Sequence, residues 1–215
     1  MAAPFSIDLW SDVVCPYCYL GSRQLTGALD RFAHRDDVVL RHHAFELDPN
    51  SPASFDRPLD ELVATKYSMP IERARELHRR LESQAEELGM TWSLAQAKPT
   101  NTFDAHRLIA LGTHQGLGDE MSQRLFQGYF CEGLCLSDHE QLTALASEVG
   151  VLDAALLWDT DAFARDVRGD EASAQELGIT GVPAILIDNK FMILGAQGVE
   201  HILNVLRRAW TRRAA

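Results

Sequence analysis

The chain has 215 residues, of which 46% are hydrophobic and 24% charged, and its formal net charge is −11. This length allows one large domain or one domain with a sizeable insertion, and the composition is that of an ordinary globular protein. The acidic balance provides no overall positive field, so we expect neither nucleic acid nor an anionic membrane as a partner. Arginines near the end are interpreted as cations that stabilise the C-terminal end of the last helix. They are Arg207, Arg208, Arg212 and Arg213.

The N-terminal stretch from Met1 to Ser6 has neither a positive segment nor a long apolar one, so we predict no secretory signal. No stretch approaches the roughly 18 apolar residues that a membrane span requires. These features predict a cytoplasmic protein, in which paired cysteines are more often catalytic or metal-binding than structural. The sequence leaves the oligomeric state open, and a homodimer is one of the states that it allows.

The chain begins with a β-α-β pattern. Residues 5–10 read as a short strand, residues 16–33 carry an apolar stripe at helical spacing, and residues 38–45 form a second strand-like run. Because a helix connects the two strands, we expect them to be parallel and joined by a right-handed crossover.

From Pro58 to about Leu177 the sequence is almost wholly helical. Ser68 and Thr102 are predicted N-cap residues, and Ser137 to Glu140 has the spacing of a capping box. The last helical segment, from Asp161 to Leu177, is compatible with an interruption at Gly169. The helices are predicted to begin near Ser68, Thr102, Asp119, Ser137 and Asp161, and glycines mark their ends at Gly89, Gly116, Gly133, Gly150 and Gly178.

The last part of the chain returns to strands. Residues 184–187 and 191–194 predict an antiparallel hairpin, and a helix should follow from Gly198 to about Trp210. The two ends together predict an α/β protein of the thioredoxin-like fold, with β-α-β and β-β-α halves forming one mixed sheet flanked by helices. We place this domain at residues 1–50 plus 170–215, and a large inserted all-helical domain at residues 51–169.

Cys15 and Cys18 form a Cys-x-x-Cys where the first strand leads into the first helix. Residues three apart in a helical first turn lie on one face, so the two sulfurs can close a small disulfide ring. The Cys15 sulfur would lie near the unpaired N–H groups of the helix, which favour a thiolate. The alternative is a structural zinc site shared with Cys131 and Cys135. The dipeptide Pro16-Tyr17 is unlike the small residues of a zinc knuckle, so we expect no metal.

Three segments carry a family resemblance: residues 11–21 around the two cysteines, residues 101–108 with the sequence NTFDAHRL, and residues 178–183 with the sequence GITGVP. They resemble the DsbA-like thioredoxin-fold family, and within it the FrnE-like cytoplasmic dithiol–disulfide oxidoreductases. The resemblance implies that Cys15 is the nucleophile of disulfide exchange and that Cys18 resolves the mixed disulfide.

The resemblance implies further site residues near the two cysteines. The dipeptide Pro16-Tyr17 would tune the pKa of the thiols, and Pro183 would be the cis-proline that packs beside the sulfurs. The backbone of Val182 would pair with an extended substrate segment. Asp8 has two interpretations. It matches the buried acid of related folds only if the loop of residues 11–14 carries one extra residue, and otherwise it is an exposed carboxylate at a strand edge.

The middle of the chain offers weaker candidates. Asn101 and His106 belong to a helical segment that could line a cleft between the domains, although Asn101 and Thr102 are first of all predicted helix caps. His106 is interpreted either as structural or as part of the redox site. Cys131 and Cys135 depart from the family pattern, and they are either small half-buried residues or an auxiliary redox pair.

The leading functional interpretation is an enzyme that exchanges disulfides with a protein or a small molecule. It needs no resident cofactor, with glutathione as a candidate co-substrate. One alternative is a glutathione-dependent isomerase or transferase, similar to 2-hydroxychromene-2-carboxylate isomerases and kappa-class glutathione transferases. Those families commonly carry serine in place of Cys15 and need no resolving thiol, so Cys18 favours redox chemistry. The other is a chaperone whose helical insert holds unfolded chains. The reducing cytoplasm favours reduction or isomerisation, but the dipeptide alone does not set the direction.

Overall fold

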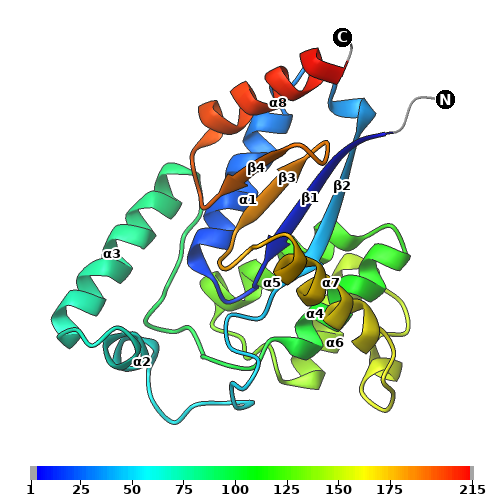
Figure 1. The fold of residues 1–215 in the computed structure, drawn as a ribbon. Coiled ribbons are helices and arrows are strands. Elements are labelled where there is room, and N and C mark those ends of the chain that lie inside the picture. Colours follow the sequence, from blue (N-terminus) through cyan, green and yellow to red (C-terminus); the bar gives the residue numbers. More distant parts are fainter. Residues whose placement is uncertain (1–3, 214–215) are drawn as a thin grey trace. The chain divides into compact units, whose positions relative to one another are not determined.

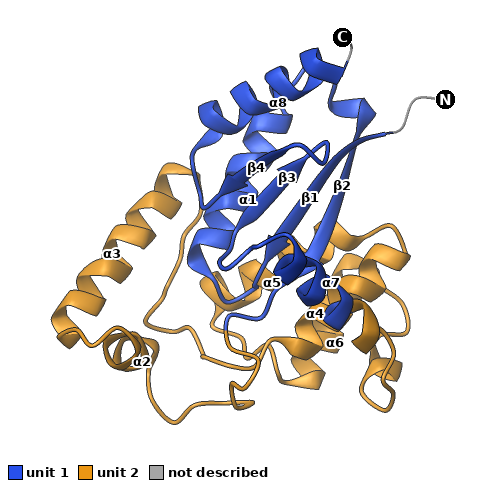
Figure 2. Cartoon of the chain, viewed as in Figure 1, with its two compact units in different colours: residues 1–47, 167–215 blue, residues 48–166 orange. Residues whose placement is uncertain are grey.

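A computed structural model of the chain describes residues 4–213, so the first three residues of the stretch examined for a secretory signal lie outside it. The chain divides into two compact units, residues 1–47 with 167–215 and residues 48–166 (Figure 2). We call them the sheet unit and the helical unit. Among the described residues, no helix has both the length and the apolar character needed to cross a membrane.

The sheet unit contains one mixed four-stranded sheet in the order β2-β1-β3-β4 (Figure 1). The strands are β1 (Phe5–Ser11), β2 (Val38–Ala44), β3 (Ala184–Ile187) and β4 (Phe191–Leu194). β1 is parallel to β2 and antiparallel to β3, which in turn is antiparallel to β4. The hairpin turns at Asp188 and Asn189, whose φ angles of 50° and 54° suit a tight two-residue turn. The predicted thioredoxin-like sheet is confirmed.

Helices cover both faces of this sheet (Figure 1). They are α1 (Pro16–Leu29), α7 (Ala164–Glu176) and α8 (Val199–Arg213), and a short 3₁₀ helix, η1 (Arg35–Asp37), precedes β2. Because side chains alternate along a strand, Phe5, Ile7 and Leu9 of β1 share one face, where they pack with residues of α1 and α8. Trp10 points to the other face and packs with Ala174 of α7. β1 is therefore buried on both faces at the centre of the unit.

The helical unit is built mainly from α-helices. They are α2 (Leu59–Lys66), α3 (Ile71–Glu87), α4 (Phe103–His114), α5 (Gly118–Glu132) and α6 (His139–Val149), followed by the 3₁₀ helix η2 (Ala154–Leu157). Several of the largest fully buried side chains of the chain come from α4 and α5, so these two helices carry much of the core of the unit. They include Leu108, Met121, Leu125, Phe126, Tyr129 and Phe130.

Two of the predicted N-caps differ from the structure. Ser68 does not cap α3, because the residue that precedes the helix is Pro70 and Ser68 lies at a φ of 51°. Thr102 stands at the N-cap of α4 but makes no capping hydrogen bond with its side chain. Asn101, which was also predicted to cap this helix, takes that role, since its Oδ1 accepts the backbone N–H of Phe103 at 2.9 Å.

The capping box predicted at Ser137 is also wrong. The N-cap of α6 is Asp138, whose carboxylate accepts the backbone N–H groups of Glu140 and Gln141. A carboxylate at this end also interacts favourably with the positive end of the helix dipole. Ser137 instead donates its hydroxyl to the carbonyl oxygen of Ala53, at 2.5 Å.

The predicted C-terminal ends of the helices agree with the structure better than the predicted N-caps do. Gly133 and Gly150 take the left-handed backbone conformation at the C-caps of α5 and α6, as predicted. α7 begins at Ala164, three residues after the predicted start, and it passes through Gly169 without an interruption.

Candidate active site

The Cys-x-x-Cys lies at the start of α1. Cys15 is the N-cap residue, and Pro16 occupies the first turn, where its missing N–H is no loss. The chain reaches the helix through a tight turn at residues 13–14, which is closed by the Cys15 N–H bonding to the Asp12 carbonyl at 3.0 Å. Cys18 N–H bonds to the Cys15 carbonyl, also at 3.0 Å. The turn and the proline together fix where β1 ends and the helix begins.

The sulfurs of Cys15 and Cys18 differ in environment, although both cysteines are free thiols. Cys15 is 5% exposed and Cys18 is 0% exposed. Burial, reinforced by the hydrogen bond and the charge of Cys15, raises the pKa of Cys18 well above its ordinary value. Cys18 Sγ accepts the backbone N–H of Asp12 at 3.5 Å, and Cys15 Sγ donates to the Val182 carbonyl at 3.8 Å. Cys15 is thus the outer thiol and Cys18 the inner one.

The loop that carries Val182 is fixed by Pro183. The peptide bond between these two residues is cis, and the Pro183 carbonyl accepts the N–H of Gly195 at 2.7 Å, just after β4. Gly21 of α1 faces the Pro183 ring, and a Cβ built at this glycine would lie 2.8 Å from the proline Cγ. Sequence reasoning misses Gly21, although a glycine inside a helical pattern is itself a signal of close packing.

Gly21→Ala is therefore expected to destabilise the protein by about 1–3 kcal/mol, because the added methyl group overlaps with the Pro183 ring. Gly169→Ala is the matched control, since Gly169 is exposed on α7 with nothing within 4 Å of a built Cβ. That change should stabilise the protein by up to about 1 kcal/mol through helix propensity. Urea denaturation measures both, and equal stability of Gly21→Ala and the wild type would contradict this close packing.

Asp8 lies on β1, at the centre of the sheet, and it is 7% exposed. The interpretation as an exposed strand-edge carboxylate is therefore wrong. Its Oδ1 lies 3.0 Å from His43 Nε2 and 3.4 Å from a guanidinium nitrogen of Arg41. Burial by itself would raise the pKa of Asp8, but the hydrogen bond and charge of His43, together with Arg41, lower it overall. Asp8 is a buried anion with two cationic partners.

His43 is the centre of a polar cluster that sequence reasoning misses. Its Nδ1 lies 2.6 Å from Asp170 Oδ1, and its ring stacks on Trp10 with centroids 4.5 Å apart. Burial alone would lower the pKa of His43, but the hydrogen bonds to Asp170 and Asp8, and their charges, raise it to about 9. The second oxygen of Asp170 accepts the backbone N–H of Ala44 at 2.9 Å. The cluster therefore joins α7 to β1 and β2.

Asp12 is a second buried acid that sequence reasoning misses, and it is only 1% exposed. Its Oδ2 accepts the backbone N–H of Leu47 at 2.8 Å, while its own backbone contacts both cysteines as described above. The signal in the sequence is its position, three residues before Cys15 in the loop that connects β1 to α1. Asp12 thus links the active-site turn to the segment that follows β2.

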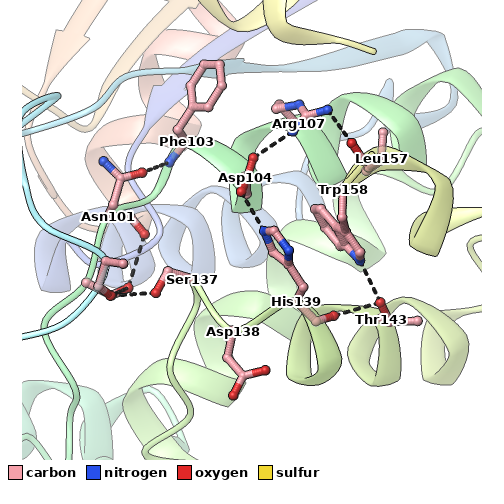
Figure 3. Close-up of polar contacts among 12 residues, drawn as sticks. Asn101, Phe103, Asp104, Arg107, Ser137, Asp138, His139, Thr143, Leu157 and Trp158 are labelled. Carbon is pink, nitrogen blue, oxygen red and sulfur yellow. Dashed lines mark hydrogen bonds and ion pairs between the residues drawn. The ribbon is translucent and has the colours of Figure 1, made fainter. Parts of the chain in front are cut away.

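The remaining candidates lie in the helical unit. Asn101 donates its side-chain N–H to the Ser51 carbonyl at 3.2 Å, and its oxygen points to Phe103 at the start of α4 (Figure 3). His106 lies on α4 and is 3% exposed. Asn101 therefore has a structural role in connecting two segments of the helical unit. The assignment of both residues to a cleft stays a prediction.

Cys131 and Cys135 are half-buried free thiols whose pKa values are shifted in opposite directions. Burial and the charge of Glu132 raise the pKa of Cys131. Burial opposes ionisation of Cys135 as well, but its hydrogen bonds with Ser137 and Thr100 lower its pKa overall. Their hydroxyl oxygens lie 3.4 and 3.7 Å from the Cys135 sulfur. A redox role for this pair stays a prediction. Within residues 4–213, no three His, Cys, Asp or Glu side chains are placed to hold a metal ion.

Comparison with known proteins agrees with this geometry. The family model described as the DSBA-like thioredoxin domain matches residues 6–207. The chain belongs to this family. Our DSBA-like chain is also similar to the crystal structure of a probable DsbA oxidoreductase from Streptomyces coelicolor, with 32% sequence identity and a TM-score of 0.92. That match covers 96% of this chain and 90% of the other.

More distant structures share the fold of this DSBA-like protein. The cytosolic disulfide reductase DsbM from Pseudomonas aeruginosa, solved with GSH, is 16% identical with a TM-score of 0.68, covering 96% of this chain and 99% of that one. A 2-hydroxychromene-2-carboxylate isomerase is 14% identical with a TM-score of 0.70, covering 97% of this chain and 98% of that one. At these identities the likeness establishes the fold and leaves the reaction to be argued from the site.

Proposed function

We propose that this DSBA-like protein is a thiol–disulfide oxidoreductase of the FrnE-like subgroup, with Cys15 as nucleophile and Cys18 as resolving cysteine. The observation that carries the proposal is the arrangement of the two thiols. They lie in hydrogen-bond contact at the first turn of α1, and Cys15 faces the carbonyl that precedes Pro183. The substrates are disulfide- or dithiol-containing proteins or small molecules.

The reaction has two exchange steps. Ionised Cys15 attacks a substrate disulfide, so that a mixed disulfide forms and the first substrate sulfur leaves as a thiolate. Cys18 then attacks the Cys15 sulfur, which closes the Cys15–Cys18 disulfide and releases the second substrate sulfur. The backbone beside Pro183 supplies an edge on which an extended substrate segment can pair, with Val182 as the pairing residue. Oxidation of a dithiol substrate is the same sequence in reverse.

The proposal includes the direction of disulfide exchange and the cellular compartment in which it takes place. We assign the protein to the cytoplasm, where it reduces or rearranges disulfides and glutathione regenerates the dithiol. The DsbM neighbour, described as a cytosolic disulfide reductase and solved with GSH, supports the choice of glutathione as the first reductant to test. Pro16 and Tyr17 flank the nucleophile and complete the site, and Tyr17 is 44% exposed, so it is available to contact a substrate.

A Cys18→Ser variant tests the proposal. Wild-type protein with glutathione should reduce the disulfides of insulin, whereas Cys18→Ser should stop at the mixed disulfide and hold its partners covalently on Cys15. Partners released by reductant and identified by mass spectrometry would name the substrates. Cys131→Ser, which also removes one thiol, is the control and should trap nothing.

Other results would point to the alternatives. A glutathione-dependent isomerase needs no resolving thiol. Isomerase activity that persists in Cys18→Ser, together with the absence of insulin reduction by the wild type, would therefore contradict the redox assignment. Suppression of aggregation that is undiminished in a Cys15→Ser/Cys18→Ser double variant, again without redox turnover, would indicate a chaperone.

A further inference from the structure

Residues 195–198, which we call the β4–α8 loop, connect β4 to α8 (Figure 1). The first residue of the loop, Gly195, donates its N–H to the Pro183 carbonyl at 2.7 Å. The loop is partly exposed, so a substrate segment that pairs with Val182 can contact it. Whatever holds this loop in place therefore also helps to fix the backbone of the proposed substrate site.

One face of α1 runs along the β4–α8 loop and the start of α8. A Cβ built on Gly21 would lie 3.9 Å from the Ala196 Cα, and Gln24 Oε1 accepts the Gly198 N–H at 2.8 Å. A Cβ built on Gly27 would lie 3.3 Å from a side-chain carbon of the first residue of α8. Because these α1 residues are three apart, they are neighbours on the helix surface. The two glycines allow a close approach, and the glutamine between them bonds to the loop.

The β4–α8 loop needs such a contact, because its backbone is intrinsically free. Gly195 and Gly198 have φ angles of 77° and 90°, which residues with side chains rarely adopt. A glycine at each end gives the loop many alternative conformations, so contacts outside the loop must select one of them. Gln197 donates its side-chain N–H to the Leu194 carbonyl at 2.8 Å, next to β4. At the α8 end this function falls to the half-buried Gln24.

The segments around the outer sulfur carry no charged side chain. Residues 13–17, 180–183 and 195–198 contain no Asp, Glu, Lys, Arg or His. A polypeptide substrate therefore contacts backbone and uncharged groups here, and these segments offer it no ion pair. Its affinity then depends on how well the backbone at Val182 is ordered before the substrate arrives, because ordering that backbone on binding would cost free energy.

We propose that Gln24 is a positioning residue for polypeptide substrates: it holds the β4–α8 loop on α1 and thereby fixes Pro183 and the pairing backbone of Val182. The inference rests on the function proposed above. The two cysteines are held separately, by backbone hydrogen bonds in the turn before α1 and in the first turn of the helix. Loss of the Gln24 contact therefore weakens substrate binding and leaves the reactivity of Cys15 unchanged.

Gln24→Met tests this role, because methionine has a similar length but offers no oxygen to the Gly198 N–H. With saturating glutathione, the KM for insulin should rise about tenfold while kcat stays unchanged, which is the upper range for loss of one neutral hydrogen bond. Hydroxyethyl disulfide has no peptide backbone that could pair with Val182. It should oxidise the reduced variant to the Cys15–Cys18 disulfide at the wild-type rate. Acid quenching and peptide mapping measure this rate and separate this pair from the other two cysteines.

Three further variants separate positioning from a general effect on the fold. Gln24→Glu keeps an oxygen acceptor and should keep the wild-type KM for insulin. Gln127→Met makes the same change at an exposed glutamine of α5, so it is the matched control and should change neither measurement. Gly198→Ala displaces the loop without altering α1, because alanine rarely adopts the φ of 90° found there. It should raise the KM for insulin as Gln24→Met does.

An unchanged KM for insulin in Gln24→Met would overturn the inference. Equal losses with insulin and hydroxyethyl disulfide would also overturn it, because they would show a general effect on the fold. If urea denaturation shows that Gln24→Met is not folded, Gly198→Ala decides by the same two criteria. Failure of the wild type to reduce insulin would instead overturn the proposed function.

Discussion

Cys15→Ser is expected to abolish disulfide reduction, lowering insulin turnover with glutathione to the rate seen without protein. The outer sulfur is the one that faces the carbonyl before Pro183, and Cys18 is completely buried, so the inner thiol cannot replace the outer one. A serine hydroxyl at this position cannot form the mixed disulfide on which both exchange steps depend. Turbidity of reduced insulin measures the loss directly.

The matched control for this prediction is Cys131→Ser, which makes the same chemical change on α5 and should keep full activity. Both variants should show wild-type stability in urea, because replacing one sulfur by oxygen removes little packing. Cys131 is partly accessible, and Cys15 stands at the N-terminus of α1. Activity retained by Cys15→Ser would make the nucleophile assignment untenable, whatever the behaviour of the control.

The second large effect concerns stability: between pH 6 and pH 10 the free energy of unfolding should fall by about 3 kcal/mol because His43 loses its proton. Asp170 and Asp8 raise the pKa of folded His43 to about 9, against an ordinary value of 6.5. A histidine with a raised pKa stabilises the fold fully below its unfolded pKa, and this contribution disappears as the pH rises through the folded pKa. The loss should therefore begin near pH 6.5 and be complete above about pH 9.

His43→Gln isolates this contribution from other groups that titrate in the same range. Glutamine cannot become a cation, so the variant should be less stable than the wild type at pH 6 and approach it at pH 10. Urea denaturation at a series of pH values measures both proteins. Parallel curves across the whole range would show that the Asp8–His43–Asp170 cluster carries no pH-dependent stability. At the acid end, Asp8 has a lowered pKa, so its own contribution is lost only as the pH falls below its ordinary range.

The cluster and the thiols respond to pH in opposite ways. Exchange becomes faster as thiols ionise, whereas the contacts that hold α7 to β1 and β2 weaken as His43 loses its proton. Redox assays at alkaline pH should therefore be accompanied by measurements of stability, so that unfolding is not taken for loss of a catalytic proton.

Local patterns in the sequence determined the fold class. Alternating and helical hydrophobic spacing placed the strands of the sheet and most helices, because these periodicities depend only on near neighbours along the chain. The hairpin at residues 188–189 and the helix ends at Gly133 and Gly150 followed from local backbone geometry in the same way. The Cys15–Cys18 spacing predicted a redox pair at a helix start, since three residues in a first turn bring two side chains to one face.

Predictions were less secure where several neighbouring residues compete for one role. Asn101 and Thr102 were both predicted to cap α4, yet Asn101 makes the capping hydrogen bond, and at α6 Asp138 makes it in place of Ser137. Short polar residues in a row offer alternatives of similar energy, and distant contacts decide between them. Ser137 illustrates this, because its hydroxyl is engaged by the carbonyl of Ala53, 84 positions away.

Tertiary structure alone decided the surroundings of the two cysteines. His43 meets Asp8 across 35 positions and Asp170 across 127, and no local pattern specifies such pairs. The packing of Gly21 on the Pro183 ring and the burial of Asp12 arise in the same way, when strands and helices from both ends of the chain assemble. The sequence by itself predicted which sulfur atoms exchange disulfides, because that chemistry depends on residue type and short spacing. Only the tertiary structure decided how the two thiols are buried and how the nearby acids are paired, because burial and charge pairing depend on groups far apart along the chain.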